Sequence, residues 1–275
     1  MKIGSLCSGY GGLDMAVEAY FDAETLWMCD NDKYASIVIK ERWGLPNLGN
    51  LKEVDWTTVE PIDILTAGYP CQPFSNAGLR KGLSDERHIW PSIKEIISQI
   101  RPNIVILENV RGHLTLGFKE VLKDLTEIGY DAQWAIVRAS DVGAPHRRER
   151  LFVIAKPSNS PGKGLQGSCR EGYGFEQGSS SHTDSNRNEQ QGNRTTQRLG
   201  SRFNSQSEMR LQRAPNPLDL NNKLSPKFVE YMMGLPVGWV TDLDISRSQQ
   251  LKLLGNGVVP QQAYKAINDL MAIKY

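Results

Sequence analysis

Residues 103–110 read NIVILENV and place four consecutive apolar side chains directly before Glu108. An uninterrupted apolar run of this length is typical of a strand that helices cover on both faces. From residue 2 to about residue 155, similar short runs alternate with longer segments of helical period. This alternation predicts βα units in a doubly wound, mainly parallel α/β sheet.

The same patterns give the expected elements in chain order. Strands are expected over 2–6, 23–30, 62–68, 103–110, 132–139 and 150–155, and helices over 13–20, 32–44, 88–102, 118–129, 225–236 and 261–273. The last two strands form a closing pair, for which an antiparallel arrangement is open. Gly44 is expected to end the second helix, and Ser225 with Pro226 to begin the fifth.

Composition changes sharply after Pro157. Residues 158–216 are rich in Ser, Gly, Asn, Gln and Arg, with few large apolar side chains, so this stretch cannot build a core of its own. Two interpretations stay open: a poorly ordered linker or surface insertion, and an arm that follows phosphates and becomes ordered on binding.

Length, charge and cysteine content restrict the class of protein. A chain of 275 residues can form one large domain, or one domain with a smaller lobe. Its formal net charge of +1 provides no overall field for nucleic acid, so such binding needs a local basic patch. The four cysteines form no CxxC pair and the four histidines no HExxH pattern, which argues against a zinc site or a disulfide framework. No apolar segment reaches about 18 residues, so we expect a soluble, cytoplasmic protein without membrane or metal.

The residues that follow the first two strands are candidates for ligand binding, because open α/β sheets bind ligands at the carboxyl ends of their strands. SGYGG, residues 8–12, is a glycine turn that lets a ligand approach the backbone. Asp30 follows roughly 20 residues later, where a carboxylate can accept hydrogen bonds from ribose hydroxyls. The alternatives are an ordinary turn and a helix cap, and the missing Walker lysine disfavours a nucleoside triphosphate.

The next two strands are followed by chemically reactive residues. AGYPCQPFSNAG, residues 67–78, holds Cys71 between two prolines that restrict the direction of its thiol. Glu108 directly follows an apolar strand, where burial without a partner is costly. HRRER, residues 146–150, offers guanidinium groups for a phosphate or carboxylate. A surface glutamate and a solvated charge run are the alternatives, and a hydrolytic dyad of Cys71 with His146 or His88 is disfavoured because no third orienting residue is visible.

Seven motifs in order resemble those of the DNA cytosine-5 methyltransferases of bacterial and phage type. They are LCSGYGG, Asp30, GYPCQPFS, LENV, HRRERLF, KLSPKFVEYMMGLP and LLGNGVVPQ, and the resemblance covers residues 1–156 and 223–275. It implies a fold of the S-adenosylmethionine-dependent methyltransferase type with a small, irregular inserted target-recognition lobe. The catalytic and cofactor-binding domain would be residues 1–156 plus 240–275, and the target-recognition region residues 157–239.

The resemblance also implies roles for individual residues. Cys71 would add to carbon 6 of a flipped-out cytosine, Glu108 would contact the pyrimidine N3 and amino group, and Arg148, with Arg150, would hold the base oxygen. The implied cofactor is S-adenosylmethionine, with S-adenosylhomocysteine as product. Its implied binding residues are Cys7, Ser8, Gly9, Tyr10, Gly11, Gly12, Asp30, Asn31, Asn50, Leu51, Gly68, Pro70, Asn256 and Val258. The implied DNA contacts are Gln72, Ser75 and Arg87.

Three positions depart from the usual motifs of that family. Cys7 replaces a phenylalanine, Asn50 replaces an acid, and His146 stands where glutamine is common; we expect these changes to tune cofactor affinity. The expected partners of this monomer are double-stranded DNA and, in a restriction-modification system, a companion restriction endonuclease. The alternatives are a non-catalytic relative that binds cofactor or DNA, and a transfer-RNA cytosine-5 methyltransferase.

Overall fold

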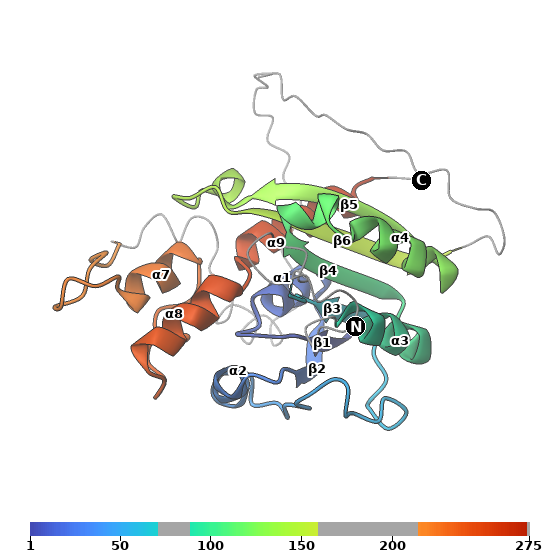
Figure 1. The fold of residues 1–275 in the computed structure, drawn as a ribbon, viewed down its shortest axis with the longest axis horizontal. Coiled ribbons are helices and arrows are strands. Elements are labelled where there is room, and N and C mark those ends of the chain that lie inside the picture. The colour runs from blue at the N-terminus through green and yellow to red at the C-terminus, as the bar shows by residue number, and fades with distance from the viewer. Residues whose placement is uncertain (71–88, 159–213, 274–275) are drawn as a thin grey trace, which may run out of the picture.

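The computed structural model describes residues 1–70, 89–158 and 214–273, which form a sheet with helices on both of its faces (Figure 1). The strands are β1 (Lys2–Leu6), β2 (Glu24–Cys29), β3 (Ile64–Ala67), β4 (Ile104–Val110), β5 (Tyr130–Arg138) and β6 (Glu149–Pro157). The α-helices are α1 (Gly12–Phe21), α2 (Lys33–Val38), α3 (Trp90–Ile100), α4 (Phe118–Glu127), α7 (Pro226–Met232), α8 (Arg247–Asn256) and α9 (Pro260–Met271). A π-helical turn, η1 (Ile39–Trp43), continues α2, and two 3-10 turns, η3 (Arg111–Thr115) and η4 (Ala139–Val142), follow β4 and β5.

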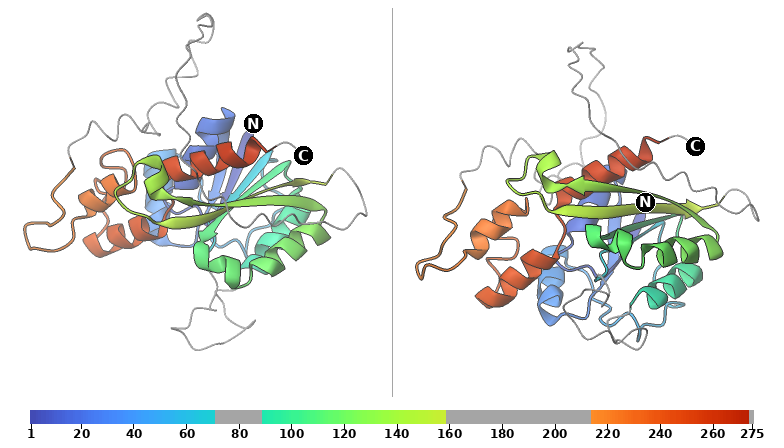
Figure 2. Two further views of the ribbon diagram at one scale, coloured as in Figure 1. Left: turned by 90° about the horizontal axis from the view of Figure 1, so that it is seen from above. Right: turned by 45° about the horizontal axis from the view of Figure 1, so that its top comes forward.

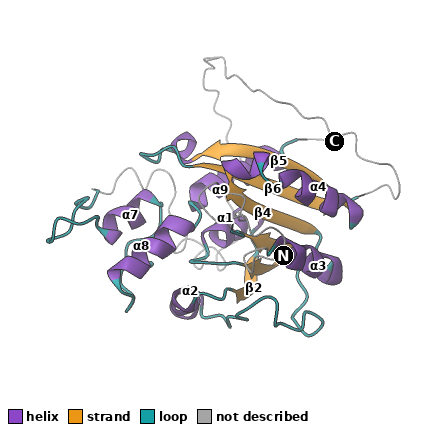
Figure 3. Ribbon diagram, in the orientation of Figure 1, coloured by secondary structure: helices purple, strands orange, loops and turns teal. Residues whose placement is uncertain are grey.

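The strands of the described residues form one sheet in the order β2-β1-β3-β4-β6-β5 (orange in Figure 3). Neighbours from β2 to β4 pair in parallel, which confirms the predicted doubly wound, mainly parallel sheet. β6 runs antiparallel to both β4 and β5, because the chain turns back after β5 and returns between the two strands. This return places residues 149–157 directly beside the apolar strand β4.

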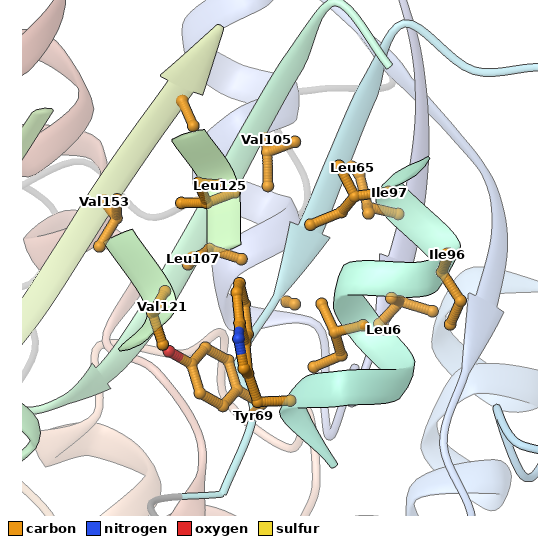
Figure 4. Close-up of a cluster of buried hydrophobic side chains, with 14 of the residues drawn as sticks. Leu6, Leu65, Tyr69, Ile96, Ile97, Val105, Leu107, Val121, Leu125 and Val153 are labelled. Atoms are coloured by element: carbon orange, nitrogen blue, oxygen red, sulfur yellow. The ribbon is translucent and has the colours of Figure 1, made fainter. Parts of the chain in front are cut away.

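Alternate side chains of the strands explain why both faces of the sheet are covered. Ile104 and Ile106 of β4 belong to a buried cluster with residues of α1 and α9. Val105 and Leu107 belong to a second cluster with residues of α3 and α4, as Figure 4 shows. The views of Figure 2 agree, since α9 lies on one side of the sheet and α3 and α4 lie on the other. The next residues of β4, Glu108 and Asn109, continue the alternation and therefore point to opposite faces.

The predicted ends of the elements agree with the structure to within a few residues. Gly44 adopts the left-handed conformation, with φ 66°, at the end of the second helix, as expected. The side chain of Ser225 accepts a hydrogen bond from the Phe228 backbone N–H at the start of α7, again as expected. The helix expected over 32–44 is correct in extent, but its last turn is π-helical. α8 was not predicted, because residues 247–256 carry no clear apolar stripe.

A third buried cluster joins the segment around α7 and α8 to α1 and α2. The indole N–H groups of Trp43 and Trp239 both donate to the Tyr10 carbonyl, at 3.3 and 3.1 Å. Val240 is buried in the same cluster. Trp239 and Val240, on either side of the predicted domain boundary, share this cluster, and the division into two regions stays a prediction. Among the described residues, no helix combines the length and the apolar character needed to cross a membrane.

The carboxylate of Glu230 organises the turn that follows α7. It is buried and accepts hydrogen bonds from the backbone N–H groups of Gly238, Val240 and Thr241, at 2.7, 2.6 and 3.0 Å. The Thr241 hydroxyl donates a further bond at 2.8 Å. One side chain therefore satisfies most of the donors of this buried turn.

We predict that Glu230→Ala lowers the free energy of unfolding by about 3 kcal/mol, because it leaves several buried donors without an acceptor. Urea denaturation measures the change. The matched control is Glu41→Ala, which removes an exposed carboxylate and should change stability by less than about 0.5 kcal/mol. Equal stability of the two variants would contradict this assignment.

Candidate active site

A cavity of about 650 Å³ lies at the carboxyl ends of the four parallel strands. Its volume is within the range of small-molecule and cofactor sites. Most of the residues that the sequence analysis proposed for the cofactor line it: Cys7, Ser8, Gly9, Gly12, Asp30, Asn31, Asn50, Leu51, Gly68, Pro70, Asn256 and Val258. The cavity also reaches Glu108 and Arg150, so both predicted sets of residues border one space.

Asp30 connects the glycine turn to the end of β2. One of its carboxylate oxygens accepts a hydrogen bond from the Gly9 backbone N–H at 2.8 Å, and the other accepts one from the Asp32 N–H at 2.8 Å. Burial raises the pKa of Asp30, and these two hydrogen bonds lower it. Because an ionised carboxylate has about four acceptor positions, Asp30 can still accept hydrogen bonds from a ligand in the cavity.

Gly9 leaves room for a ligand beside the turn. It has φ 57°, and no atom lies within 4 Å of the position that a Cβ would occupy. Cys7 is half-buried at the start of the turn, and removal of its thiol from water together with the charge of Asp30 raises its pKa. Cys7 is therefore a neutral, apolar wall of the cavity at neutral pH.

Tyr10 and Gly11 were also proposed as cofactor residues, but neither is among the residues that line the cavity. The Tyr10 side chain is fully buried, and its hydroxyl donates to the Val258 carbonyl at 2.6 Å. A Cβ at Gly257 would lie 1.9 Å from the Tyr10 ring, so the close approach requires glycine there. Tyr10 thus joins the glycine turn to the C-terminal segment behind the cavity wall.

The carboxylate of Glu108 forms an ion pair with Arg150, with 2.9 Å between Oε1 and Nε. Glu108 is 6% exposed. Burial raises its pKa to about 7, although the charges of Arg150 and Arg148 oppose the shift. A carboxyl group with this pKa exists in both protonation states near neutral pH, which suits an acid–base role.

Arg148 contacts the C-terminal segment, and its predicted contact with the base stays a prediction. Its guanidinium donates to the Gly255 and Gly257 carbonyls at 2.8 and 2.6 Å, and it does not line the cavity. The Arg148 backbone has φ 26° just before β6 begins, and its carbonyl accepts a bond from Gln262 Nε2 at 2.7 Å. Arg150 is therefore the arginine that pairs with Glu108, while Arg148 acts on the same carboxylate through its charge.

The backbone that leads to Cys71 is fixed at Tyr69. The Tyr69 carbonyl accepts a hydrogen bond from Asn109 Nδ2 at 3.1 Å, and its hydroxyl lies 3.0 Å from His113 Nε2. The Tyr69 ring packs against Trp90 with 5.5 Å between ring centroids, and Figure 4 shows it beside Leu107 and Val121. Pro70, the next residue, borders the cavity. Cys71, Gln72, Ser75, Arg87 and His88 lie outside the described residues, so their roles stay predictions.

Charged residues that were not selected from the sequence also line the cavity, among them Asp14 and Lys252. Asp14 lies in the first turn of α1, where an acidic residue is common in any helix, so nothing in the sequence indicated a binding role. Lys252 lies on α8, which was not predicted, and its ammonium pairs with Asp32 at 2.8 Å.

The His146 ring forms a hydrogen bond with the backbone of α7. Its Nε2 lies 2.9 Å from the Met232 carbonyl oxygen. No group of His, Cys, Asp and Glu suited to a metal ion occurs within residues 1–70, 89–158 and 214–273.

The fold is similar to that of solved methyltransferase structures. A mutant of DNMT2 from Spodoptera frugiperda superposes with a TM-score of 0.66 at 18% identity, over 98% of this chain and 99% of that chain. A DNA modification methyltransferase encoded within an E. coli prophage gives a TM-score of 0.62 at 17% identity, over 99% of this chain and 100% of that chain. At this level of identity the likeness concerns the fold alone.

Sequence comparison then defines the family. The model of the C-5 cytosine-specific DNA methylase family matches residues 1–166, and this chain belongs to that family. The Type II methyltransferase M.NgoBI of Neisseria gonorrhoeae is 34% identical over 161 residues, which are 57% of this chain and 50% of that protein. M.HhaI of Haemophilus parahaemolyticus is 34% identical over 154 residues, 54% of this chain and 47% of that protein. The chain spans about half the length of the curated relatives it matches.

We predict that Arg150→Gln raises the pKa of Glu108 above about 7, because the mutation removes the nearest positive charge while burial of the carboxyl group remains. NMR titration of 13C-labelled glutamate carboxyl groups measures it. Arg138→Gln is the control, since Arg138 pairs with Glu149 and not with Glu108. A Glu108 pKa that stays the same or falls in Arg150→Gln would show that the ion pair does not set it.

Proposed function

We propose that this chain transfers a methyl group from S-adenosylmethionine to carbon 5 of a flipped-out cytosine in a specific sequence of double-stranded DNA, through a covalent adduct with Cys71. The observation that carries the proposal is the buried Glu108–Arg150 pair at one end of a cavity whose other end holds Asp30 and the glycine turn. Groups that can bind a pyrimidine and groups that can bind a nucleoside thus border the same cavity. Membership of the C-5 cytosine-specific DNA methylase family supports the proposal.

The residues of the cavity fit S-adenosylmethionine. Gly9 lets a ligand approach the backbone before α1, and Asp30 can accept hydrogen bonds from ribose hydroxyls. Asn256 and Val258 border the same cavity from the C-terminal segment. The bound cofactor would supply an electrophilic methyl group on a positively charged sulfur.

The chain's own residues would make the cytosine ring reactive. Carbon 5 of cytosine is a poor nucleophile, and addition of the Cys71 thiolate to carbon 6 moves electrons into the ring. Glu108, with a pKa of about 7, can hold a proton for N3 as negative charge develops there. Arg150 lies where a guanidinium can stabilise the same charge. After methylation, a water molecule would accept the carbon 5 proton, and its electron pair would form the double bond between carbons 5 and 6 as the sulfur–carbon bond breaks. Cys71 would leave as a thiolate, and N3 would return its proton to Glu108.

DNA as the substrate, base flipping and a companion endonuclease belong to the proposal as well. A cytosine in a base stack is closed to attack at carbon 6, so the target base must leave the helix, at a cost of about a few kcal/mol. The curated relatives are Type II methyltransferases, which supports DNA as substrate. Transfer RNA remains the alternative substrate that the sequence analysis left open.

We predict that Glu108→Gln lowers kcat for methyl transfer by about a hundredfold or more, because the amide cannot supply a proton to N3. The activity of the unmodified chain should fall as pH rises through about 7, where Glu108 loses its proton, and this alkaline limb should be absent from the residual activity of the variant. Steady-state kinetics between pH 5.5 and 9 measure both effects. Glu127→Gln, which changes an exposed carboxyl group on α4, is the control and should leave kcat and the pH profile unchanged. An unchanged kcat in Glu108→Gln would rule out the role.

We predict that the chain transfers tritiated methyl groups to duplex DNA and that Cys71→Ala abolishes the transfer, because the nucleophile is removed. Parallel reactions with transfer RNA distinguish the two substrate classes, and bisulfite sequencing of the DNA identifies the methylated cytosine and its context. Transfer to RNA alone would replace DNA as the substrate. Transfer by the alanine variant at an equal rate would refute the covalent mechanism.

A further inference from the structure

The carboxylate of Asp14 is held across the two central strands of the sheet. Asp14 lies in α1 and is 1% exposed. Its Oδ2 accepts a hydrogen bond from the Ser5 hydroxyl of β1 at 3.0 Å, and its Oδ1 accepts one from the Thr66 hydroxyl of β3 at 2.5 Å. All three residues also line the cavity. The position of this buried carboxylate is therefore fixed at the base of the site.

Asp14 forms no ion pair with any cation in the part of the chain that the structure describes. Burial raises its pKa to about 6, the two hydroxyl groups lower it, and the charge of Glu18 raises it further. Of the three other acids that line the cavity, Glu108 pairs with Arg150 and Asp32 pairs with Lys252, whereas Asp30 is held by the backbone N–H groups of Gly9 and Asp32. A buried carboxylate is normally paired with a positive charge. At pH 8 the Asp14 carboxyl group is ionised, and no positively charged side chain among the described residues pairs with it.

The strand order shows where that positive charge would come from. Asp30 lies at the end of β2 and Glu108 lies on β4, with β1 and β3 between them. In the proposed function the ribose lies by Asp30 and the target cytosine by Glu108. The sulfur that connects the ribose to the transferred methyl group must lie between them, over the strands that carry Ser5 and Thr66.

We propose that Asp14 faces the positively charged sulfur of S-adenosylmethionine and makes the site prefer this cofactor to S-adenosylhomocysteine. The inference rests on the proposed function for the identity of the ligand. The two molecules share the adenosine, the carboxylate and the ammonium group, and they differ in the methyl group and in the charge on sulfur. The attraction of Asp14 for the charged sulfur therefore acts on the methyl donor alone and is lost when the methyl group has been transferred. The site would in this way release its product more readily.

A purely structural role for Asp14 has a different consequence. If its carboxylate only ties α1 to β1 and β3, its removal loosens the cavity for both ligands to the same extent. The ratio of the two dissociation constants separates these roles, and methyl transfer need not be measured.

The experiment is calorimetric titration of S-adenosylmethionine and S-adenosylhomocysteine into the full chain at pH 8. Coulomb attraction over a few Å at an effective dielectric constant of about 20 changes an affinity by at least about tenfold. Asp14→Asn should therefore lower the preference for S-adenosylmethionine by about tenfold. Glu18→Gln is the matched control, because it removes a buried carboxylate from the same helix at a position that does not line the cavity; its ratio should equal that of the unmodified chain.

A second variant exchanges the two partners, Ser5→Asp with Asp14→Ser. It moves the negative charge to the other side of a 3.0 Å hydrogen bond and should restore the preference for S-adenosylmethionine. If a thermal unfolding experiment shows that Asp14→Asn is not folded, this double variant provides the test. An unchanged ratio in Asp14→Asn, or equal weakening of both ligands, would overturn the inference while the proposed cofactor stands. If the unmodified chain binds neither ligand, the proposed function fails first.

Discussion

The ion pair between Glu108 and Arg150 is the interaction on which the arrangement of the site depends. A carboxylate that directly follows an apolar strand is buried, and loss of one partner from a buried pair costs about 3–5 kcal/mol. The partner comes from β6, which runs antiparallel to β4 and aligns Arg150 with Val110 and Phe152 with Glu108. The one reversed strand of the sheet thus places a guanidinium beside the carboxylate, and it does so next to the strand end that leads to Cys71.

The C-terminal segment completes the same site from the opposite side. The guanidinium of Arg148 holds the Gly255 and Gly257 carbonyls, the Tyr10 hydroxyl holds the Val258 carbonyl, and Gln262 holds the backbone of Arg148. These bonds connect residues that are more than 100 positions apart in the chain. The glycine turn, the start of β6 and residues 255–262 are therefore fixed relative to one another. A cavity with rigid walls of this kind can hold a cofactor and a base in one geometry, as group transfer requires.

Much of the fold and part of the site could be predicted from the sequence. The strands and most helices could be located from apolar runs and turn residues, because burial sets the spacing of apolar side chains in each kind of element. The residues that follow the parallel strands lie together, because the carboxyl ends of these strands share one edge of the sheet. Arg150 could not be separated from Arg148, since their roles depend on where the Arg148 side chain turns just before β6. Asp14 was missed because its partners, Ser5 and Thr66, lie on two different strands and meet it only in the folded sheet. α8, and with it Lys252, was missed because residues 247–256 lack a clear apolar face.

The central claim is that Cys71 attacks a cytosine held by Glu108 and Arg150 beside a methyl donor. Duplex DNA with 5-fluorocytosine at the target site tests it most directly, because fluorine cannot leave carbon 5 as a proton does and the adduct cannot break down. Mass spectrometry of the digested complex should find the nucleotide attached to the peptide that contains Cys71, in a reaction that requires S-adenosylmethionine. A chain that methylates ordinary DNA but forms no adduct, or one that forms it at Cys7, Cys29 or Cys169, would contradict the account.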